Sequence, residues 1–346
     1  MSYSQINSNW SPPSRDQLIT LSGEECSQWK IALGDIYLQT AAGKLIRLKR
    51  AGDCLEVSWR NRFKDSAQLL YRPVIHLEKI TELKNAFQKW VEATDPVDVE
   101  TYREMFTSAA RHSLRPEGGM KIIEWCYLCH ELFKPQENLI EEFQNKHVVL
   151  YRRGMMVSSL AVMLAIGCGY QDPVFLRDIY HTGWWLDAGL IHEDFSYWVA
   201  LACQAERIRP GAGDQLLEEN ATTDKEKELF LQHPRYSYNR AQESAANEFT
   251  YPDLLMSILR HHEKSDGTGF PEAMTLSVLS DWETLVMLAD NLVDYREEIL
   301  EAHDQSGLGL LWGEFKQRPL SGLPVDRIVR QLRAWLAKPK EEAISA

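Results

Sequence analysis

The hydrophobic pattern of this chain changes period near Thr81, and that change limits the folds open to it. Between residues 30 and 76, apolar and polar residues alternate in part along short runs, which is typical of half-buried strands. The runs are DIYLQTA, KLIRLKRAG, CLEVSWR and AQLLYRPVI, and the segments AAGK and AGD carry turn-forming residues. These connections are too short for parallel crossovers. The pattern therefore predicts a small antiparallel β unit.

From Thr81 onward, apolar residues recur at the spacing of an amphipathic helix. The segment RPEGGM, at 115–120, is the strongest candidate boundary in this part, and the pattern after it predicts helices to the end. Residues 204–224 are polar and rich in turn formers, so we expect a surface insertion there. The expected organisation is α+β: a tail (1–29), a small β domain (30–78), a helical connector (79–118) and an all-α domain (119–346).

Composition and charge limit the partners that this chain can have. Its 346 residues are 44% hydrophobic, and the net charge is −12. The negative charge disfavours nonspecific binding to DNA or to an anionic membrane surface. We identify no apolar run of about 18 residues, the length that a membrane helix needs. The start, MSYSQINSNWSPPSRDQ, carries no basic and apolar export signal. We therefore expect a cytoplasmic protein with no DNA or membrane partner.

The six cysteines are scattered along the chain and are too few for a disulfide framework in a protein of this length. Cys126, Cys129 and His130 belong to the segment CYLCH, which matches the CxxCH pattern of covalent haem attachment. Such attachment requires export, and the segment lies in a helical pattern that places these residues on one face. We interpret the two cysteines as small buried hydrophobes.

The histidines are a more informative set. His233 lies in LQHPRYS, at the predicted end of a short helix that Thr223 and Glu226 can open as a capping box. The adjacent His261 and His262 end the next predicted helix. Neutral imidazole is a common ligand of transition metals, so these side chains are candidate ligands.

Two aspartates lie in apolar segments, where a buried carboxylate needs a partner. Asp187 lies in WWLDAGLI, and Asp290 lies in VMLADNLVDY. Imidazole and carboxylate together suit iron, manganese or zinc. Taken singly, each of these residues is more often a capped or paired residue than a ligand. Taken together, their order and spacing predict a metal site.

The segment HHEKSDGTGFP, residues 261–271, resembles the HHExxDGxGYP signature of the HD-GYP domain, a subgroup of the helical HD phosphohydrolases. The resemblance extends over residues 120–340, where TTDKEKELFLQHP resembles the family's helix before a metal-binding histidine. VSSLAVMLAIGCG resembles the family's early alanine-rich helix. The resemblance implies an all-α domain that hydrolyses the bacterial messenger cyclic di-GMP at a site of two or three metals.

The resemblance also implies roles for individual residues. It assigns three histidine ligands, a terminal aspartate and the metal-bridging aspartate of the HD pair, which correspond in that order to His233, His261, His262, Asp290 and Asp187. The signature loop corresponds to Glu263, Asp266, Gly267, Gly269, Phe270 and Pro271.

The chain departs from the family pattern at positions that bear on catalysis. Leu186 stands where the family has the histidine of the HD pair, and Leu190 stands where it has a lysine. Arg153 aligns with an early histidine ligand, and a guanidinium is not a usual ligand. Phe270 lacks the hydroxyl of the signature tyrosine. The segment DNLVDYREEILEAHD, at 290–304, is largely acidic where the family usually has a basic phosphate-binding stretch.

We therefore expect a degenerate HD-GYP protein in bacterial cyclic di-GMP signalling, weak or inactive as a phosphodiesterase. The resemblance implies that one metal site has lost two ligands, while a second site keeps Asp187, His233, His261 and His262. The expected cofactor is thus a single transition metal: iron, manganese or zinc. The expected partners are cyclic di-GMP, as a sensed ligand, and a signalling protein. Two alternatives stay open: an active metal-dependent phosphodiesterase and a structural scaffold with an empty site.

A lost metal would leave Asp187 and Asp290 facing each other in an apolar cleft, which is electrostatically costly. The planar fork of an arginine can bind carboxylates through paired hydrogen bonds and keeps its charge. We therefore predict that Arg153, or Arg152 if the register is shifted by one, points into the cleft and pairs with Asp290 or Asp187. The alternative is that the segment YRR lies on a solvated outer face of its helix.

Overall fold

The computed structural model describes residues 13–64, 69–113, 120–191, 197–208, 211–220, 222–264, 266–275, 279–293 and 326–337. The chain forms two compact units, residues 1–81 and residues 82–346. The first unit contains a small sheet and the second is helical, so the predicted α+β class is confirmed. The finer division of the helical part into a connector and a separate domain stays a prediction.

The first unit is built around a four-stranded antiparallel sheet in the order β1-β4-β2-β3. The strands are β1 (Ile19–Leu21), β2 (Gly34–Gln39), β3 (Leu45–Lys49) and β4 (Leu69–Pro73). The central strands β2 and β4 bury Ile36, Tyr37 and Leu69 completely. The tight connection from β2 to β3 turns at Gly43, whose φ of 79° favours glycine. The turn predicted at AAGK is therefore confirmed.

Short helical segments complete the described part of this unit: η1 (Arg15–Gln17), α1 (Gly23–Ser27) and α2 (Val57–Phe63). CLEVSWR, predicted as a strand, instead leads into α2, where Trp59 packs on Phe63 with ring centroids 4.7 Å apart. Side chains four residues apart are neighbours on a helix, and this pairing outweighs a short alternating pattern. Residues 13–29, expected as part of a tail, supply the edge strand β1, which buries Leu21 against β4.

The named elements described in the second unit are all helices, and α3 (Leu77–Glu92) leads into it. Its other α-helices are α4 (Pro96–Ser113), α5 (Ile122–Phe133), α6 (Glu137–Lys146), α7 (Val148–Gly167), α8 (Pro173–Trp185), α9 (Tyr197–Ile208), α10 (Ala212–Glu219), α11 (Asp224–Ala245), α12 (Leu254–Arg260), α13 (Asp281–Leu292) and α16 (Asp326–Ala337). The single-turn segments η2 (Ala188–Leu190) and η3 (Ala246–Glu248) follow α8 and α11.

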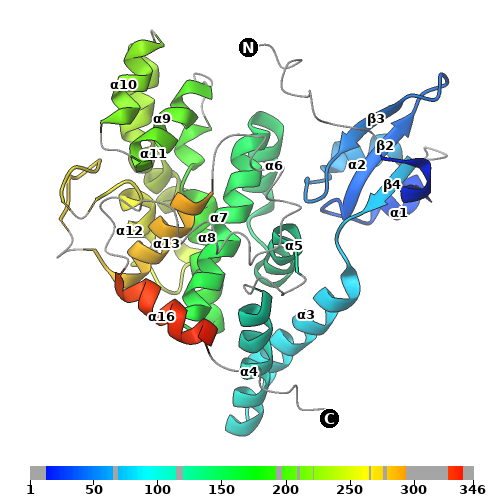
Figure 1. The fold of residues 1–346 in the computed structure, drawn as a ribbon, viewed down its shortest axis with the longest axis horizontal. Coiled ribbons are helices and arrows are strands. Elements are labelled where there is room, and N and C mark those ends of the chain that lie inside the picture. Colours follow the sequence, from blue (N-terminus) through cyan, green and yellow to red (C-terminus); the bar gives the residue numbers. More distant parts are fainter. Residues whose placement is uncertain are drawn as a thin grey trace. The chain divides into compact units, whose positions relative to one another are not determined.

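Helix α7 is the central helix of the second unit, with α5, α6, α8 and α13 packed against it (Figure 1). Every residue from Leu150 to Gly167 is buried, as expected for a core helix that is apolar on all sides. Contrary to the expectation from the sequence, α7 is long and apolar enough to cross a membrane. However, 94% of that window is buried inside the protein, which is the environment of a core helix.

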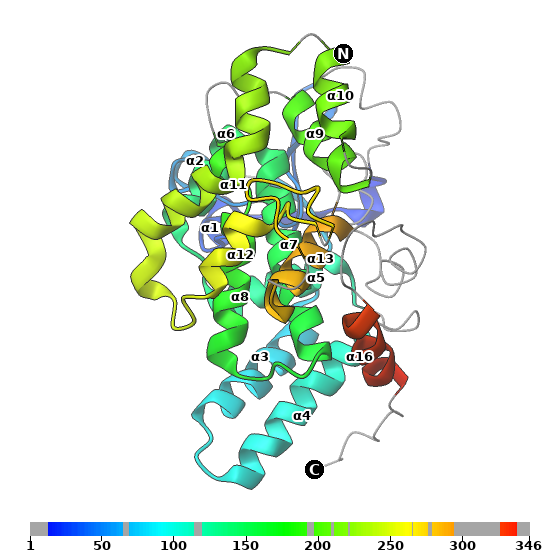
Figure 2. The same cartoon turned by 90° about the vertical axis from the view of Figure 1, so that its left-hand side faces the viewer.

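Helices α9 and α10 pair with each other, and α9 also packs on α11 (Figure 2). Much of 204–224 is exposed, as predicted, but the segment also contributes to packed helices. Leu217 is fully buried, and Glu206 is also buried. The carboxylate of Glu206 accepts the backbone N–H groups of Gly211 and Gly213, both at 3.1 Å, and so fixes the start of α10. The turn formers of this segment therefore connect two packed helices.

Candidate metal centre

The residues assigned ligand roles from the sequence lie in one buried cluster of the helical unit. His233 comes from α11, His261 and His262 follow α12, Asp187 follows α8, and Asp290 comes from α13. All five residues are buried, with exposures of 4% or less. Their predicted convergence is therefore observed, whereas their role as metal ligands stays a prediction.

His233 lies inside α11, which continues through Pro234, so the predicted helix end at His233 is wrong. The predicted capping box is present, because Thr223 and Glu226 exchange side-chain and backbone hydrogen bonds. Proline has no N–H to donate to the carbonyl of Phe230, four residues earlier. Nδ1 of His233 lies 2.8 Å from that oxygen. Since a carbonyl can only accept, Nδ1 carries the proton, and Nε2 of the neutral ring keeps its lone pair.

His261 is oriented in the same way by the end of α12. Its Nδ1 lies 2.7 Å from the carbonyl oxygen of Ile258, in the last helical turn. Its Nε2 then faces the Nε2 of His233 at 3.2 Å. Two lone pairs at this distance repel each other unless a cation, either a proton or a metal ion, lies beside them. The pair of imidazoles is therefore arranged to bind a cation.

The backbone on either side of Asp187 is held against α11 by Ser237, which lies one turn beyond His233. The hydroxyl of Ser237 donates to the carbonyl of Leu186 and accepts the N–H of Gly189, both at 2.7 Å. Position 189 requires glycine because a Cβ there would lie 2.3 Å from the carbonyl oxygen of His233. This close approach brings Oδ1 of Asp187 to 3.9 Å from Nε2 of His233.

The signature loop supports His262 directly. The ring of Phe270 stacks on the imidazole of His262 with centroids 4.6 Å apart and an interplanar angle of 13°. A Cβ at position 269 would lie 2.4 Å from the carbonyl oxygen of His262, so Gly269 allows the loop to fold back onto the histidine. Gly267 has a φ of 78°, which favours glycine. The glycines of the signature therefore serve this local packing.

The acidic residues of the same loop accept backbone hydrogen bonds that fold it. Glu263 is buried and accepts the N–H groups of Glu272 at 2.6 Å and Met274 at 2.7 Å, while burial raises its pKa. Asp266 is exposed and accepts from the hydroxyl and N–H of Thr268, and these bonds lower its pKa. Both carboxylates thus shape the loop.

Arg153 points into the cluster and binds both aspartates. Its guanidinium donates to Oδ2 of Asp187, to Oδ1 of Asp290 at 2.5 Å and to the carbonyl of Asp290 at 2.9 Å. Its Nε donates to the carbonyl of Val293 at 3.3 Å. The side-chain exposures are 1%, 4% and 0% for Arg153, Asp187 and Asp290. The predicted pairing is confirmed for both carboxylates, and the alternative of a solvated YRR patch is wrong.

Two other positions that depart from the family pattern are apolar core residues. Leu186 and Leu190 are 1% and 0% exposed, and neither offers a metal ligand or a positive charge. The acidic stretch predicted to replace the basic phosphate-binding segment lies, beyond Val293, outside the described residues.

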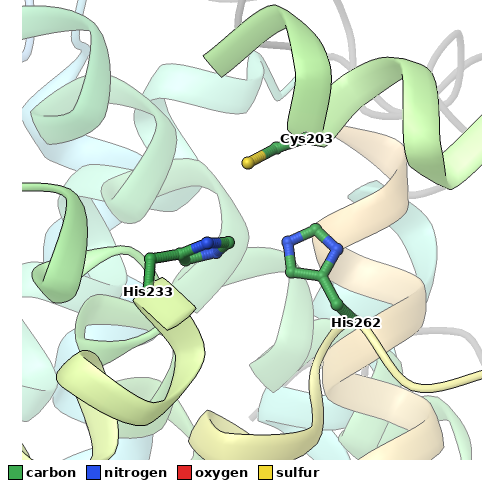
Figure 3. Close-up of side chains that lie close together, drawn as sticks. All are labelled: Cys203, His233 and His262. Atoms are coloured by element: carbon green, nitrogen blue, oxygen red, sulfur yellow. The ribbon is translucent and has the colours of Figure 1, made fainter. Parts of the chain in front are cut away.

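Cys203 is a member of this cluster that sequence reasoning missed. It is fully buried on α9, and its Sγ lies within 4.8 Å of a ring nitrogen of His233 and of His262 (Figure 3). A second group of candidate ligands consists of Asp187, His233 and His261. Nothing in the apolar segment YWVALACQAERI sets this cysteine apart from the others, because only the packing of α9 on α11 brings it to the histidines.

The cysteines of the CYLCH segment lie in the core. Cys126 and Cys129 are fully buried in α5, and burial raises the pKa of Cys126 to about 12. A neutral thiol shut away from solvent is a poor nucleophile. Their surroundings therefore support the interpretation as small hydrophobes.

The donors of the cluster fit one metal ion. Both candidate groups include His233, whose Nε2 has a single lone pair and can bind one ion at a time. Where the resemblance implies a further metal, the guanidinium of Arg153 already binds the carboxylates of Asp187 and Asp290. A single transition metal among the histidines therefore fits these residues, and a second ion between the aspartates does not.

Comparisons with known proteins add little to this picture. No protein-family model matches the sequence, and no curated protein matches it. Among solved structures, the chain is similar to Bd1817, a HDG"Y"P protein from Bdellovibrio bacteriovorus. That similarity has 15% sequence identity and a TM-score of 0.38, and it covers 93% of this chain and 100% of that chain. A similarity this weak carries no argument about function, so the cluster is interpreted from its own residues.

Proposed function

We propose that this chain is a degenerate HD-GYP-like protein that holds one transition metal and acts in bacterial cyclic di-GMP signalling without efficient hydrolysis. It would act by sensing the ligand or by contacting a partner protein. The resemblance of HHEKSDGTGFP to the family signature supports the family. The burial of the histidines beside Asp187 supports a metal site.

The observation that carries the proposal is the position of Arg153. Its guanidinium binds Asp187 and Asp290, the two carboxylates to which the family resemblance assigns metals. Arginine stays charged at any physiological pH, so a dication beside it would meet a like charge. An ion can then bind only on the histidine side of Asp187.

A single ion is poorly suited to phosphodiester hydrolysis of this kind. Paired metals activate the attacking oxygen and stabilise the leaving one, whereas one ion supplies a Lewis acid on one side only. Leu186 and Leu190 provide neither a ligand nor a cation in compensation. Losing one preorganised electrostatic donor typically raises a barrier by about 3–4 kcal/mol. The combined losses therefore predict activity lower by many orders of magnitude.

The protein's own side chains would hold the ion in a defined orientation. His233 and His261 present Nε2 because backbone carbonyls bind Nδ1, and Ser237 on α11 binds the backbone of Leu186 and Gly189 on either side of Asp187. Outer contacts of this type tune metal affinity by about 10–100-fold in other metal sites.

The test combines metal content, ligand binding and turnover of the purified full-length protein. After reconstitution with iron, manganese or zinc in turn, we expect one ion per chain by mass spectrometry. We also expect no cyclic di-GMP hydrolysis above the background of a His233→Ala variant. Calorimetry with cyclic di-GMP separates ligand sensing from action through protein contacts alone.

Two results would contradict the proposal. Two or more ions per chain, with turnover near about one per second that disappears in the His233→Ala variant, indicate an active phosphodiesterase. Failure to bind any of the three metals indicates the scaffold alternative.

A further inference from the structure

The thiol of Cys203 adds a soft donor to a site whose other donors are nitrogen and oxygen. We infer that Cys203 is a metal ligand, and that the single ion in this cluster is held by Cys203, His233 and His262 in place of the alternative set Asp187, His233 and His261. The inference rests on the proposed function only in requiring that the cluster binds a metal. It goes further by naming a sulfur ligand and a preference for zinc-like ions.

The first support is geometric. Sγ of Cys203 and one ring nitrogen each of His233 and His262 all lie within 4.8 Å of one another. The thiol and both rings turn toward a common space (Figure 3). Donor atoms around a tetrahedral zinc ion are about 3.3–3.6 Å apart, given Zn–N near 2.0–2.1 Å and Zn–S near 2.3 Å. Small side-chain rotations therefore suffice to close these groups on one ion.

The second support is a buried ion pair between Lys264 and Glu206, which joins the signature loop to α9. Nζ of Lys264 donates to the carboxylate of Glu206 at 2.8 Å and to its carbonyl at 2.7 Å, with exposures of 7% and 5% for the two side chains. Glu206 lies three residues after Cys203, on the same face of α9. Lys264 lies two residues after His262. The ion pair between Lys264 and Glu206 therefore fixes α9, which carries Cys203, relative to His262.

A buried cysteine is often only a small hydrophobe, as Cys126 is here. Cys203 differs because its sulfur lies beside two imidazole nitrogens, which an apolar role does not need. Metal binding would form a metal–sulfur bond and break the S–H bond, and the proton would pass to solvent without any redox change. Thiolate favours zinc over manganese, so the sulfur would select the ion.

Cobalt(II) is the probe that reports a sulfur ligand directly. We propose to load the metal-free full-length protein with cobalt(II) and to record the near-ultraviolet band of thiolate-to-cobalt charge transfer. The band should appear in the wild type and in Cys168→Ser, a half-buried cysteine at the end of α7. It should be absent in Cys203→Ser, whose zinc affinity should fall by about tenfold or more while manganese binding stays unchanged.

The outcomes separate the sulfur ligand from the metal site. Cobalt that binds the wild-type protein without the band overturns the inference and leaves the single-metal proposal standing, even if Cys203→Ser fails to fold. A band that persists in folded Cys203→Ser also overturns it. Absence of any cobalt, zinc or manganese binding to the wild type refutes both.

Discussion

The guanidinium of Arg153 lies 2.5 Å from Oδ1 of Asp290, a residue 137 positions further along the chain. The same guanidinium binds Asp187, so one positive charge faces two carboxylates in a buried site. Arg153 binds Oδ2 of Asp187, whereas Oδ1 of the same carboxylate lies 3.9 Å from Nε2 of His233. A carboxylate oxygen beside the histidines favours a cation there, while the guanidinium already stands between the aspartates.

Replacing Arg153 by alanine should destabilise the helical unit by about 3–5 kcal/mol, because it removes the cation that binds two buried carboxylates. Arg153→Lys should recover part of this loss, since it restores the charge but not the planar fork. Urea unfolding followed by tryptophan fluorescence measures both effects.

The matched control is Arg103→Ala. Arg103 also pairs with a carboxylate, that of Glu100, but the two side chains are 31% and 61% exposed. Its loss should stay below about 1 kcal/mol. Equal losses in the free energy of unfolding for the two substitutions would show that the buried ion pairs stabilise the fold no more than an exposed one.

Replacing Arg153 by histidine should raise the metal content above that of the wild type, because a ligand takes the place of a fixed cation. Cyclic di-GMP hydrolysis should remain undetectable, since Leu186 still lacks a donor. Leu186→His, the control, adds an imidazole beside an unchanged guanidinium and should leave the metal content as it was. Mass spectrometry of the loaded proteins decides, and a rise in the control alone would contradict the role given to Arg153.

Pro234→Ala tests how the backbone orients His233. The new N–H would compete for the carbonyl of Phe230, which now lies 2.8 Å from Nδ1 of His233. We expect unchanged helix content by circular dichroism and zinc affinity lower by up to about tenfold. An unchanged affinity would mean that this carbonyl serves both donors equally well.

His181 should make the folded protein sensitive to mild acid. Burial lowers its pKa below the usual value of 6.5, while its Nε2 lies 2.9 Å from the carbonyl of Phe133. Below about pH 6.5 the unfolded chain binds a proton that the folded chain does not, so stability falls as the pH drops toward the folded pKa. Full stability is therefore present only above that range.

The His181→Gln variant keeps an N–H donor but cannot titrate. Its free energy of unfolding should fall less than that of the wild type between about pH 7 and pH 5. His76→Gln, at an exposed histidine, serves as the control. Parallel curves for the wild type and His181→Gln would exclude the effect.

Much of the cluster could be anticipated because its residues carry chemistry that is visible in sequence. Adjacent His261 and His262 before a glycine-rich turn, and Asp187 and Asp290 inside apolar segments, are costly to bury without partners. Arg153 could be predicted for the same reason, since a pair of buried carboxylates needs a positive charge. The helical period after Thr81 was enough to place most of the helices that carry them.

Other features depend on side-chain contacts, two of them local and one between separate segments. The helix was predicted to end at His233, but α11 continues through Pro234, and the imidazole of His233 binds the carbonyl to which proline cannot donate. The sequence did not predict a role for Cys203, because its neighbours His233 and His262 come from α11 and from the turn after α12. The helix α2 replaced a predicted strand because Trp59 and Phe63 pack one turn apart. The contacts of Cys203 join separate segments, so they leave no periodic pattern in α9.

Arg153 belongs to the polypeptide, so the positive charge between Asp187 and Asp290 is present as soon as the chain is made. In a protein that fills this position with an ion, maturation waits for metal uptake, and starvation leaves an incomplete core. Here α7, α8 and α13 can close around their own cation in a cell short of metal. If the histidines bind a metal as proposed, its supply would alter the state of a protein whose core already contains this charge.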